Sequence, residues 1–199
     1  MARLTGKNVL FIIPKDYYDE DELEPLLKIM KQEEAGIYIA SGKMKDAVGM
    51  KTGRATPHLL IVDAIEGITG DSYVTGGKGT RQIKGVFHGI ILIGGKGARS
   101  YLWKDELIRL LISDRHRSGM VVAALGTAVP SLAIAGLIES GEVAASSDKH
   151  TVKELEKAKV ALAEESVTSY NRIITAAGAS AIEPFAEAFI EEVAKTAHK

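Results

Sequence analysis

The chain has 199 residues, no cysteine and a formal net charge of -1, and 46% of its residues are hydrophobic. The lack of cysteine excludes disulfides, thiolate metal ligands and thiol nucleophiles. The balanced charge argues against a nucleic-acid-binding surface. The length and apolar content suit a single domain over residues 1–199. Because no apolar stretch is long enough for a signal peptide or a membrane span, we expect a cytoplasmic protein without membrane contact.

Short runs rich in Val, Ile and Leu alternate along the chain with longer segments of helical period. The short runs predict buried strands at residues 8–13, 36–41, 89–94, 119–125 and 172–177. The helical segments span residues 22–33, 100–114 and 182–193. This alternation predicts an α/β fold with a flavodoxin-like, doubly wound and mostly parallel sheet that has helices on both faces.

Two segments interrupt the alternation. Within residues 54–88, LLIVDAI (59–65) predicts a strand, and the Gly-rich polar stretch after it predicts a β-hairpin excursion or a surface loop. Within residues 141–170, two short apolar runs flank the helical sequence VKELEKAKVALAEE. We expect both segments to belong to the same domain as the sheet.

A small repeat contains closely spaced glycines, GGKGTR (76–81) and GGKGAR (94–99). Neither copy matches a P-loop or a dinucleotide-binding fingerprint, so we expect no cofactor. The second copy follows a strand and precedes a helix, where backbone amides can face an anion. The alternative is a tight glycine turn with solvated Lys and Arg side chains. The histidines are too dispersed for metal-ligand spacing, so we expect no metal site.

The stretch AALGTAVPSL (123–132) ends an apolar run and resumes with helical spacing. A strand that turns sharply into a helix displays the nucleophile in several hydrolases. Here the turn offers only Thr127, and a threonine nucleophile needs a positioned base. Candidate bases are His150, His88 and His116, none of which adjoins Thr127 in sequence. We therefore expect Thr127 to cap the following helix, a bond worth on the order of 1 kcal/mol.

Three segments in chain order resemble the ThiJ/PfpI family, within the class I glutamine amidotransferase-like superfamily. They are FHGIILIGGKGARSYLW (87–103), GMVVAALGTAVPSLAIAGLI (119–138) and RIITAAGASAIEPFAEAFIEEV (172–193). The resemblance covers roughly residues 7–194. It implies the same flavodoxin-like fold and a homodimer or higher homo-oligomer.

The resemblance also assigns site residues. The family's nucleophilic cysteine lies three residues before the proline of the elbow, which places Thr127 at that position ahead of Pro130. The family's acidic partner falls on Asp19 in the sequence YDEDEL, with Glu20 or Glu22 as alternatives if the alignment shifts. The acid is therefore retained, and the reactive sulfur is replaced by a hydroxyl.

The oxyanion donors that the resemblance implies are backbone amides. They fall on the Gly94–Gly95 turn and on Ala128, and they need no particular side chain. Ala128 also stands where some members of the family have a histidine. Without that histidine, His150 is the base that the enzyme interpretation uses.

The sequence thus favours a ThiJ/PfpI-like protein without the family's cysteine-dependent hydrolase, glyoxalase or deglycase activity. It would act as a small-molecule-binding or stress-related pseudoenzyme through the surviving pocket. The alternative is a hydrolase or lyase that acts on a small carbonyl compound or an amide. In that alternative Thr127 or a bound water attacks, and Asp19 or His150 serves as the base.

Overall fold

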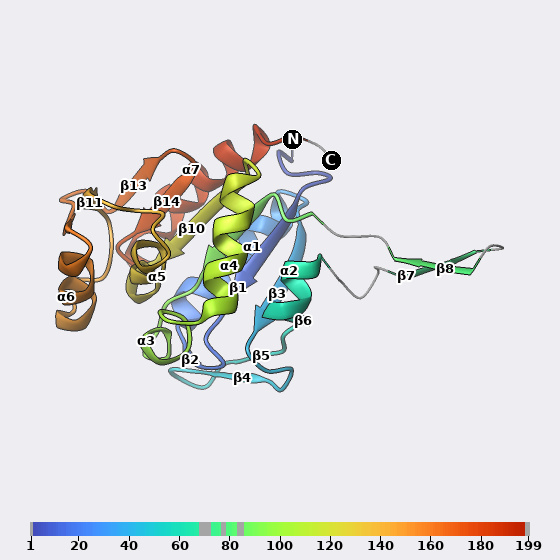
Figure 1. Ribbon diagram of the computed structural model, residues 1–199, viewed down its shortest axis with the longest axis horizontal. Coiled ribbons are helices and arrows are strands. Elements are labelled where there is room, and N and C mark those ends of the chain that lie inside the picture. Colours follow the sequence, from blue (N-terminus) through green and yellow to red (C-terminus); the bar gives the residue numbers. More distant parts are fainter. Residues whose placement is uncertain (1, 68–72, 77–78, 83–85, 198–199) are drawn as a thin grey trace.

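The central feature of the computed structural model, which describes residues 2–67, 73–76, 79–82 and 86–197, is a β-sheet (Figure 1). Within the described residues it has seven strands in the order β13-β14-β10-β9-β1-β3-β6. The strands are β1 (Asn8–Ile12), β3 (Gly36–Ser41), β6 (Leu59–Leu60), β9 (Gly89–Leu92), β10 (Val121–Leu125), β13 (Val167–Tyr170) and β14 (Ile173–Ala176). Only β13 runs antiparallel to its neighbour among these described strands. The prediction of a mostly parallel flavodoxin-like sheet is confirmed.

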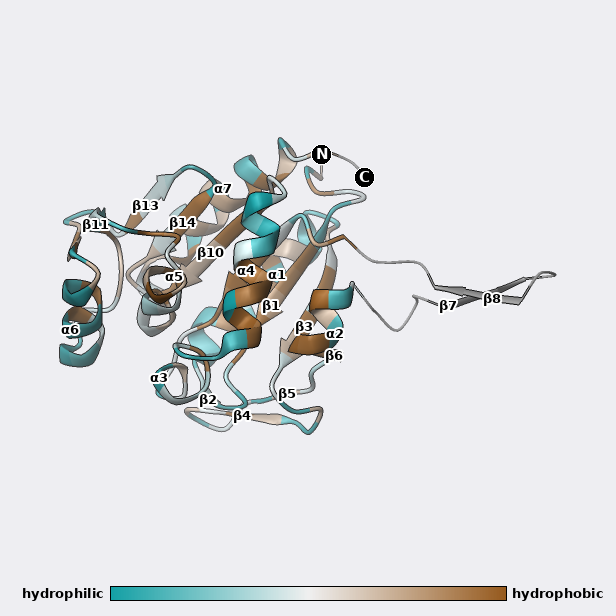
Figure 2. Ribbon diagram, viewed as in Figure 1, coloured by the Kyte–Doolittle hydropathy of each residue, from teal (hydrophilic) through white to brown (hydrophobic). Residues whose placement is uncertain are grey.

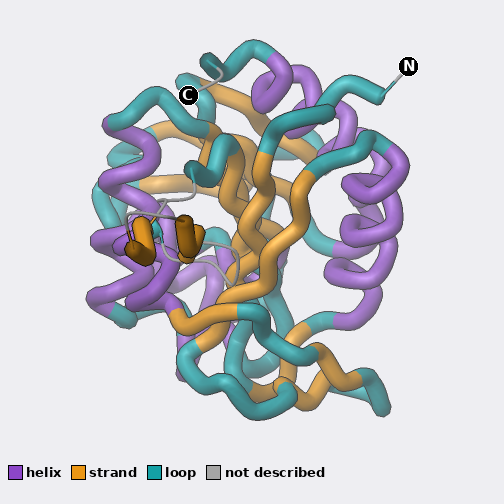
Figure 3. Tube along the Cα trace, turned by 90° about the vertical axis from the view of Figure 1, so that its right-hand side faces the viewer, coloured by secondary structure: helices purple, strands orange, loops and turns teal. Residues whose placement is uncertain are grey.

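Helices cover both faces of this sheet, as Figure 3 shows. The side chains of β1 alternate between two cores: Leu10 and Ile12 face one, and Val9 and Phe11 face the other. The first core is closed by α2 (Ile61–Glu66), α4 (Glu106–Arg117) and α5 (Pro130–Ile134). The second core is closed by α1 (Glu20–Gln32) and α7 (Ile182–Ala194). Burial on both faces explains why the central strands are continuous apolar runs, coloured brown in Figure 2.

The structure differs from the sequence predictions in three segments. Residues 59–65 form the two-residue strand β6 followed directly by α2, because the run packs one helical stripe against the first core. The predicted helix at 100–114 is two helices, α3 (Ala98–Tyr101) and α4, and Asp105 caps the second. The predicted helix after residue 151 ends early, as α6 (Lys149–Lys157), and is followed by β12 (Val160–Leu162).

Smaller sheets complete the described chain. The strands β2 (Asp16–Tyr18), β4 (Ala47–Gly49) and β5 (Arg54–Ala55) form one of them, and β11 (Gly141–Val143) pairs with β12 in another. The predicted hairpin is present as β7 (Tyr73–Gly76) and β8 (Gly79–Gln82), which pair antiparallel. Part of the first GGKG copy and of its flanks lies outside the described residues. No described helix is long and apolar enough to cross a bilayer.

The predicted apolar stripe of the last helix is fully buried. Phe189 lies in α7, stacks on Phe185 and meets the backbone of β9 at Gly89. We expect Phe189→Ala to lower the free energy of unfolding by about 3–5 kcal/mol, because it removes a buried ring and leaves a cavity. Urea denaturation measures this change. The control is Met44→Ala in the loop after β3, whose 50% exposed side chain should change stability by less than about 0.5 kcal/mol.

Candidate functional site

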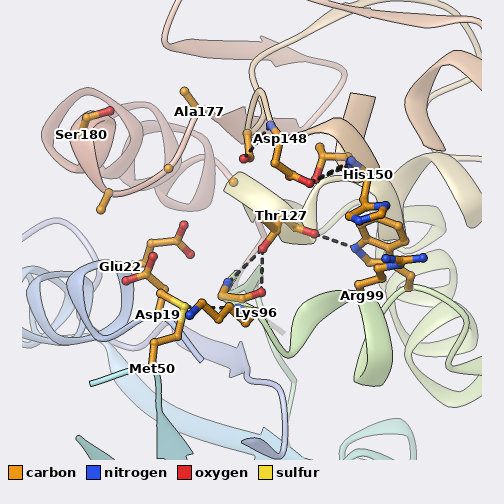
Figure 4. Close-up of a pocket in the computed structure, with 17 residues that line it drawn as sticks. Asp19, Glu22, Met50, Lys96, Arg99, Thr127, Asp148, His150, Ala177 and Ser180 are labelled. Carbon is orange, nitrogen blue, oxygen red and sulfur yellow. Dashed lines mark hydrogen bonds between the residues drawn. The ribbon is translucent and has the colours of Figure 1, made fainter. Parts of the chain in front are cut away.

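A cavity of about 560 Å³ opens beyond the carboxyl ends of β9, β10 and β14 (Figure 4). In open α/β sheets this edge is where ligands bind. The turn after β9 and the elbow after β10 form its floor, and the first turn of α1 and the start of α6 form its walls. The cavity therefore gathers the segments that the sequence singles out for a site.

The elbow after β10 makes its turn at Gly126. This residue has a φ of +51°, a left-handed conformation that favours glycine. It begins a short 3-10 helix, Gly126–Ala128, which leads into α5 at Pro130. Nucleophile elbows hold the reactive residue at such a strand-to-helix turn. The position at the tip of the turn thus carries no side chain, and Thr127 is the next residue.

The hydroxyl of Thr127 bonds to the neighbouring turn and caps no helix. Its Oγ1 donates to the carbonyl oxygen of Gly95 and accepts from the amide of Gly95, both at 2.9 Å. Neither the 3-10 helix nor α5 has a side-chain cap, so the cap prediction is wrong. The reason is the short reach across to the turn after β9, which offers a donor and an acceptor together. Trp103 holds the same residue by donating its Nε1 proton to the Thr127 carbonyl at 2.6 Å.

The amides of the glycine turn, residues 94–97, all have acceptors within the protein. In order, these acceptors are Glu22 Oε2 at 2.6 Å, Thr127 Oγ1 at 2.9 Å, Met50 Sδ at 3.3 Å and Tyr17 O at 3.0 Å. The second GGKG copy is therefore a tight structural turn, the alternative that the sequence leaves open. The amide of Gly95, an expected oxyanion donor, is already occupied by the Thr127 hydroxyl. Ala128, the other expected donor, is fully buried.

The three candidate acids have different partners. Asp19 lies on the cavity wall and caps α1, accepting the amide of Asp21 at 2.9 Å. Glu20 instead accepts three backbone amides from residues 50–53 at 2.8–3.0 Å and so fastens that loop to α1. Burial acts to raise the pKa of Glu20, but the backbone amides outweigh it and the pKa is lowered. Neither acid contacts Thr127.

Glu22 is the acid beside the elbow. Its side chain is only 2% exposed, and its Oε2 accepts the amide of Gly94. Burial, assisted by the charge of Asp19, raises the pKa of Glu22 to about 8 against the opposing bond from Gly94. A Cβ atom at Gly126 would lie 2.8 Å from Oε1 of Glu22. At neutral pH the side chain is therefore a neutral carboxylic acid that faces the bare tip of the elbow.

The candidate histidines are separated. His150 lies on the cavity wall at the start of α6, on the side of Thr127 away from Glu22 in Figure 4. His88 accepts the amide of Asn8, and His116 meets the carbonyl of Asn171, both at the opposite edge of the sheet. Across residues 2–67, 73–76, 79–82 and 86–197, no histidine, lysine or carboxylate is hydrogen bonded to the Thr127 side chain.

Sequence reasoning names Glu22 only as an alternative and does not single out the Gly126 backbone. The acidic run 19–24 looks uniform in sequence, and only the helix geometry selects the member that points inward. The sequence feature that could have identified Gly126 is its position directly after the apolar run MVVAAL. The spacing from Pro130 points instead to Thr127. Among the described residues no group of three or more His, Asp or Glu side chains is arranged to hold a metal ion.

The doubly wound sheet, with an elbow facing a buried acid at its carboxyl edge, defines the class of protein. Residues 7–192 match the DJ-1/PfpI family, and the chain belongs to this family. The uncharacterized protein MJ0967 of Methanocaldococcus jannaschii is 25% identical over 171 residues, which cover 86% of this chain and 74% of that protein. This membership confirms the family resemblance seen in the sequence.

Solved structures share the fold. A ThiJ/PfpI domain protein from Brachyspira murdochii has a TM-score of 0.79 at 21% identity, covering 98% of this chain and 99% of that chain. DJ-1beta of Drosophila melanogaster has a TM-score of 0.74 at 16% identity, covering 96% of this chain and 92% of that chain. At these identities the likeness is one of fold.

The pair of bonds between Thr127 and Gly95 predicts a cost for its removal. We expect Thr127→Val to lower the free energy of unfolding by about 1–3 kcal/mol, because a buried amide and a buried carbonyl lose their partner. Thr127→Ser keeps the hydroxyl and should lose less. Urea denaturation of the three proteins makes the comparison, and equal stability of the Val and Ser variants would contradict the assignment.

The raised pKa of Glu22 predicts a pH dependence of stability. Between about pH 4.5 and pH 8 the folded state keeps a proton that the unfolded state has lost. Stability therefore falls as the pH rises through this window, by an amount on the order of 3–5 kcal/mol for this group. Glu22→Gln has no proton to lose. The unfolding free energy of the wild type, measured relative to this variant, should decline across the window and level off above it; a flat difference would contradict the shift.

Proposed function

We propose that this DJ-1/PfpI-family protein is a small-molecule-binding or stress-related pseudoenzyme that lacks the cysteine-dependent hydrolase, glyoxalase or deglycase activity. The single observation that carries the proposal is the elbow, where Gly126 presents no side chain to the acid Glu22. The chain has no cysteine, so no other residue supplies a thiol. The cavity itself persists, at about 560 Å³, with room for a small organic molecule.

The state of Thr127 supports the same proposal. An attacking hydroxyl needs a base to take its proton, whereas this hydroxyl donates its proton to the carbonyl of Gly95. The oxyanion donor expected at Gly95 is bonded to the same hydroxyl. A carbonyl substrate at this point would have to break two hydrogen bonds before it met a nucleophile or an oxyanion hole.

A second candidate function is a hydrolase or lyase for a small carbonyl compound or amide that uses a water molecule. The observation in its favour is Glu22, which lines the cavity and directs its Oε1 at the bare backbone of Gly126. An ionised Glu22 in that place is a candidate general base for water. Its raised pKa requires this activity to increase as the pH passes about 8.

We also propose that the protein acts in the cytoplasm as a homodimer or higher homo-oligomer, as the family resemblance implies. Exposed apolar side chains on neighbouring helices, Val62 on α2 with Leu107 and Leu110 on α4, support a contact between copies. Light scattering coupled to size-exclusion chromatography measures the assembly, and a monomer at micromolar concentration would remove this part of the proposal.

The proposal predicts no turnover with small dicarbonyl compounds, activated esters or peptides. The measurement compares the purified wild type with Thr127→Ala and Glu22→Gln, over a pH range of about 6 to 9.5. Turnover by the wild type that is lost in Thr127→Ala would overturn the proposal and restore the threonine nucleophile. Turnover that survives in Thr127→Ala, rises through about pH 8 and disappears in Glu22→Gln would instead support the water mechanism.

A further inference from the structure

We propose that the cavity takes a small organic carboxylate that carries one further oxygen acceptor. The ligand's carboxylate would lie at Arg99, and its second oxygen would accept a hydrogen bond from the Glu22 carboxylic acid. This inference rests on the proposed function, because it names the class of ligand for the same cavity.

The inner end of the cavity presents an unpaired donor. Oε2 of Glu22 accepts the amide of Gly94, whereas Oε1 has no hydrogen-bond partner among the described residues. Two glycines with positive φ, Gly126 and Gly178, face Oε1, at 2.8 and 3.6 Å from their would-be Cβ atoms. A protonated carboxyl has one O–H to donate, and at Glu22 this donor meets the cavity and not a protein acceptor. Because Glu22 also lines the cavity, the part of the cavity next to its carboxyl group suits an acceptor oxygen of a ligand.

The mouth of the cavity presents unpaired cations. Lys96 and Arg99 line it with exposed side chains, and neither forms an ion pair with a carboxylate in the described part of the chain. The fork of an arginine matches a carboxylate with two parallel hydrogen bonds. His150 lines the same cavity from the start of α6 and adds a third nitrogen-bearing side chain.

The acids of the cavity do not offset these cations. Asp19 accepts the amide of Asp21 as the cap of α1, and Asp148 accepts the amides of His150 and Thr151 as the cap of α6. Carboxylates at helix N-termini are already compensated by the amides they accept. With Glu22 neutral, Lys96 and Arg99 are the charged side chains of the cavity without a hydrogen-bond or ion-pair partner in the described part of the chain. These unpaired cations favour an anionic ligand over a cationic one.

The walls between the two ends are fixed and partly apolar. The ring of Trp103 is held by its bond to the Thr127 carbonyl, and Met50 is held by the loop that Glu20 fastens to α1. A ligand with a short aliphatic chain between two polar ends would place its polar groups at Glu22 and Arg99 and its chain against Trp103 and Met50. The ligand class is therefore a small acid with an oxo, hydroxyl or amide oxygen a few carbons from its carboxylate.

Binding of such a ligand depends on the proton of Glu22. The titratable groups around that side chain are Asp19 on the same helix and Lys96 on the turn after β9; the 3-10 segments Gly126–Ala128 and Ala179–Ala181 contribute none. Burial places the pKa of Glu22 at about 8. Above that pH the donor becomes a carboxylate that repels an acceptor oxygen, so the affinity should fall by roughly tenfold for each further pH unit.

Calorimetric titration of the full chain with three probes tests the proposal. The probes are 4-oxopentanoate, which has both features, pentanoate, which lacks the second oxygen, and pentan-2-one, which lacks the carboxylate. We expect 4-oxopentanoate to bind at least about tenfold more tightly than either analogue near pH 7. Its affinity should fall roughly 30-fold between about pH 7 and pH 9.5.

Three variants separate the two ends of the site. Glu22→Gln keeps a donor without a titrating proton, so it should bind 4-oxopentanoate and lose the pH dependence. Arg99→Gln should weaken 4-oxopentanoate by about tenfold and leave pentan-2-one unchanged. Lys149→Gln is the matched control, because it removes a cation from the start of α6 that does not line the cavity, and it should change nothing.

The outcomes separate this inference from the function on which it rests. Equal binding of pentan-2-one and 4-oxopentanoate would overturn the carboxylate class and leave small-molecule binding in place. Failure of all three probes to bind, or a pH dependence that persists in Glu22→Gln, would overturn the ligand assignment. The proposed function fails separately, through turnover in the assay described above.

Discussion

The site depends on a backbone contact between two turns at the carboxyl edge of the sheet. The turn after β9 and the segment after β1 approach so closely that side chains at Gly95 or Gly97 would overlap the carbonyls of residues 16 and 17. Two backbone hydrogen bonds of 3.0 Å join the segments, from Gly97 to Tyr17 and from Asp19 to Gly94. Tyr17 adopts a φ of 60°, an uncommon conformation for a tyrosine, to make this contact. The contact sets where α1 begins and therefore where Glu22 lies.

From that contact the rest of the site follows by short steps. Once α1 begins at Glu20, the inward face of its first turn brings Glu22 against the amide of Gly94. The next amide of the turn meets the hydroxyl of Thr127, which ties β9 to the elbow after β10. The cavity is therefore framed by turns that are hydrogen bonded to one another. A rigid frame of this kind suits recognition, because little ordering is needed when a ligand binds.

The sequence predicts the sheet well and the site only in outline. Buried runs such as GIILIG and MVVAAL are short, rich in β-branched residues and bounded by glycines, which favours central strands of a parallel sheet. The run LLIVDAI is compatible with a strand or with a buried helix, and most of it forms α2 because one side of that helix packs against the first core. Counting back from Pro130 gives Thr127, whereas the tip of the turn is Gly126; a one-residue difference in a loop leaves no trace in hydrophobic pattern. Among the neighbouring acids, Glu22 differs from Asp19 and Glu20 in the backbone amides that its carboxyl group accepts, and these partners are set by the whole fold.

The reciprocal bonds of Thr127 have a consequence for how this protein could be changed. The amide and the carbonyl of Gly95 both bond to the Thr127 hydroxyl, which therefore occupies the place that a substrate oxygen would take at this amide. A nucleophile introduced at position 126 alone would lie beside a Gly95 amide that is already bonded to the Thr127 hydroxyl. Removal of the hydroxyl at position 127 alone would free the Gly95 amide without supplying a nucleophile. If the protein is the pseudoenzyme proposed above, a nucleophile with a free oxyanion donor would therefore require these two adjacent positions to change together.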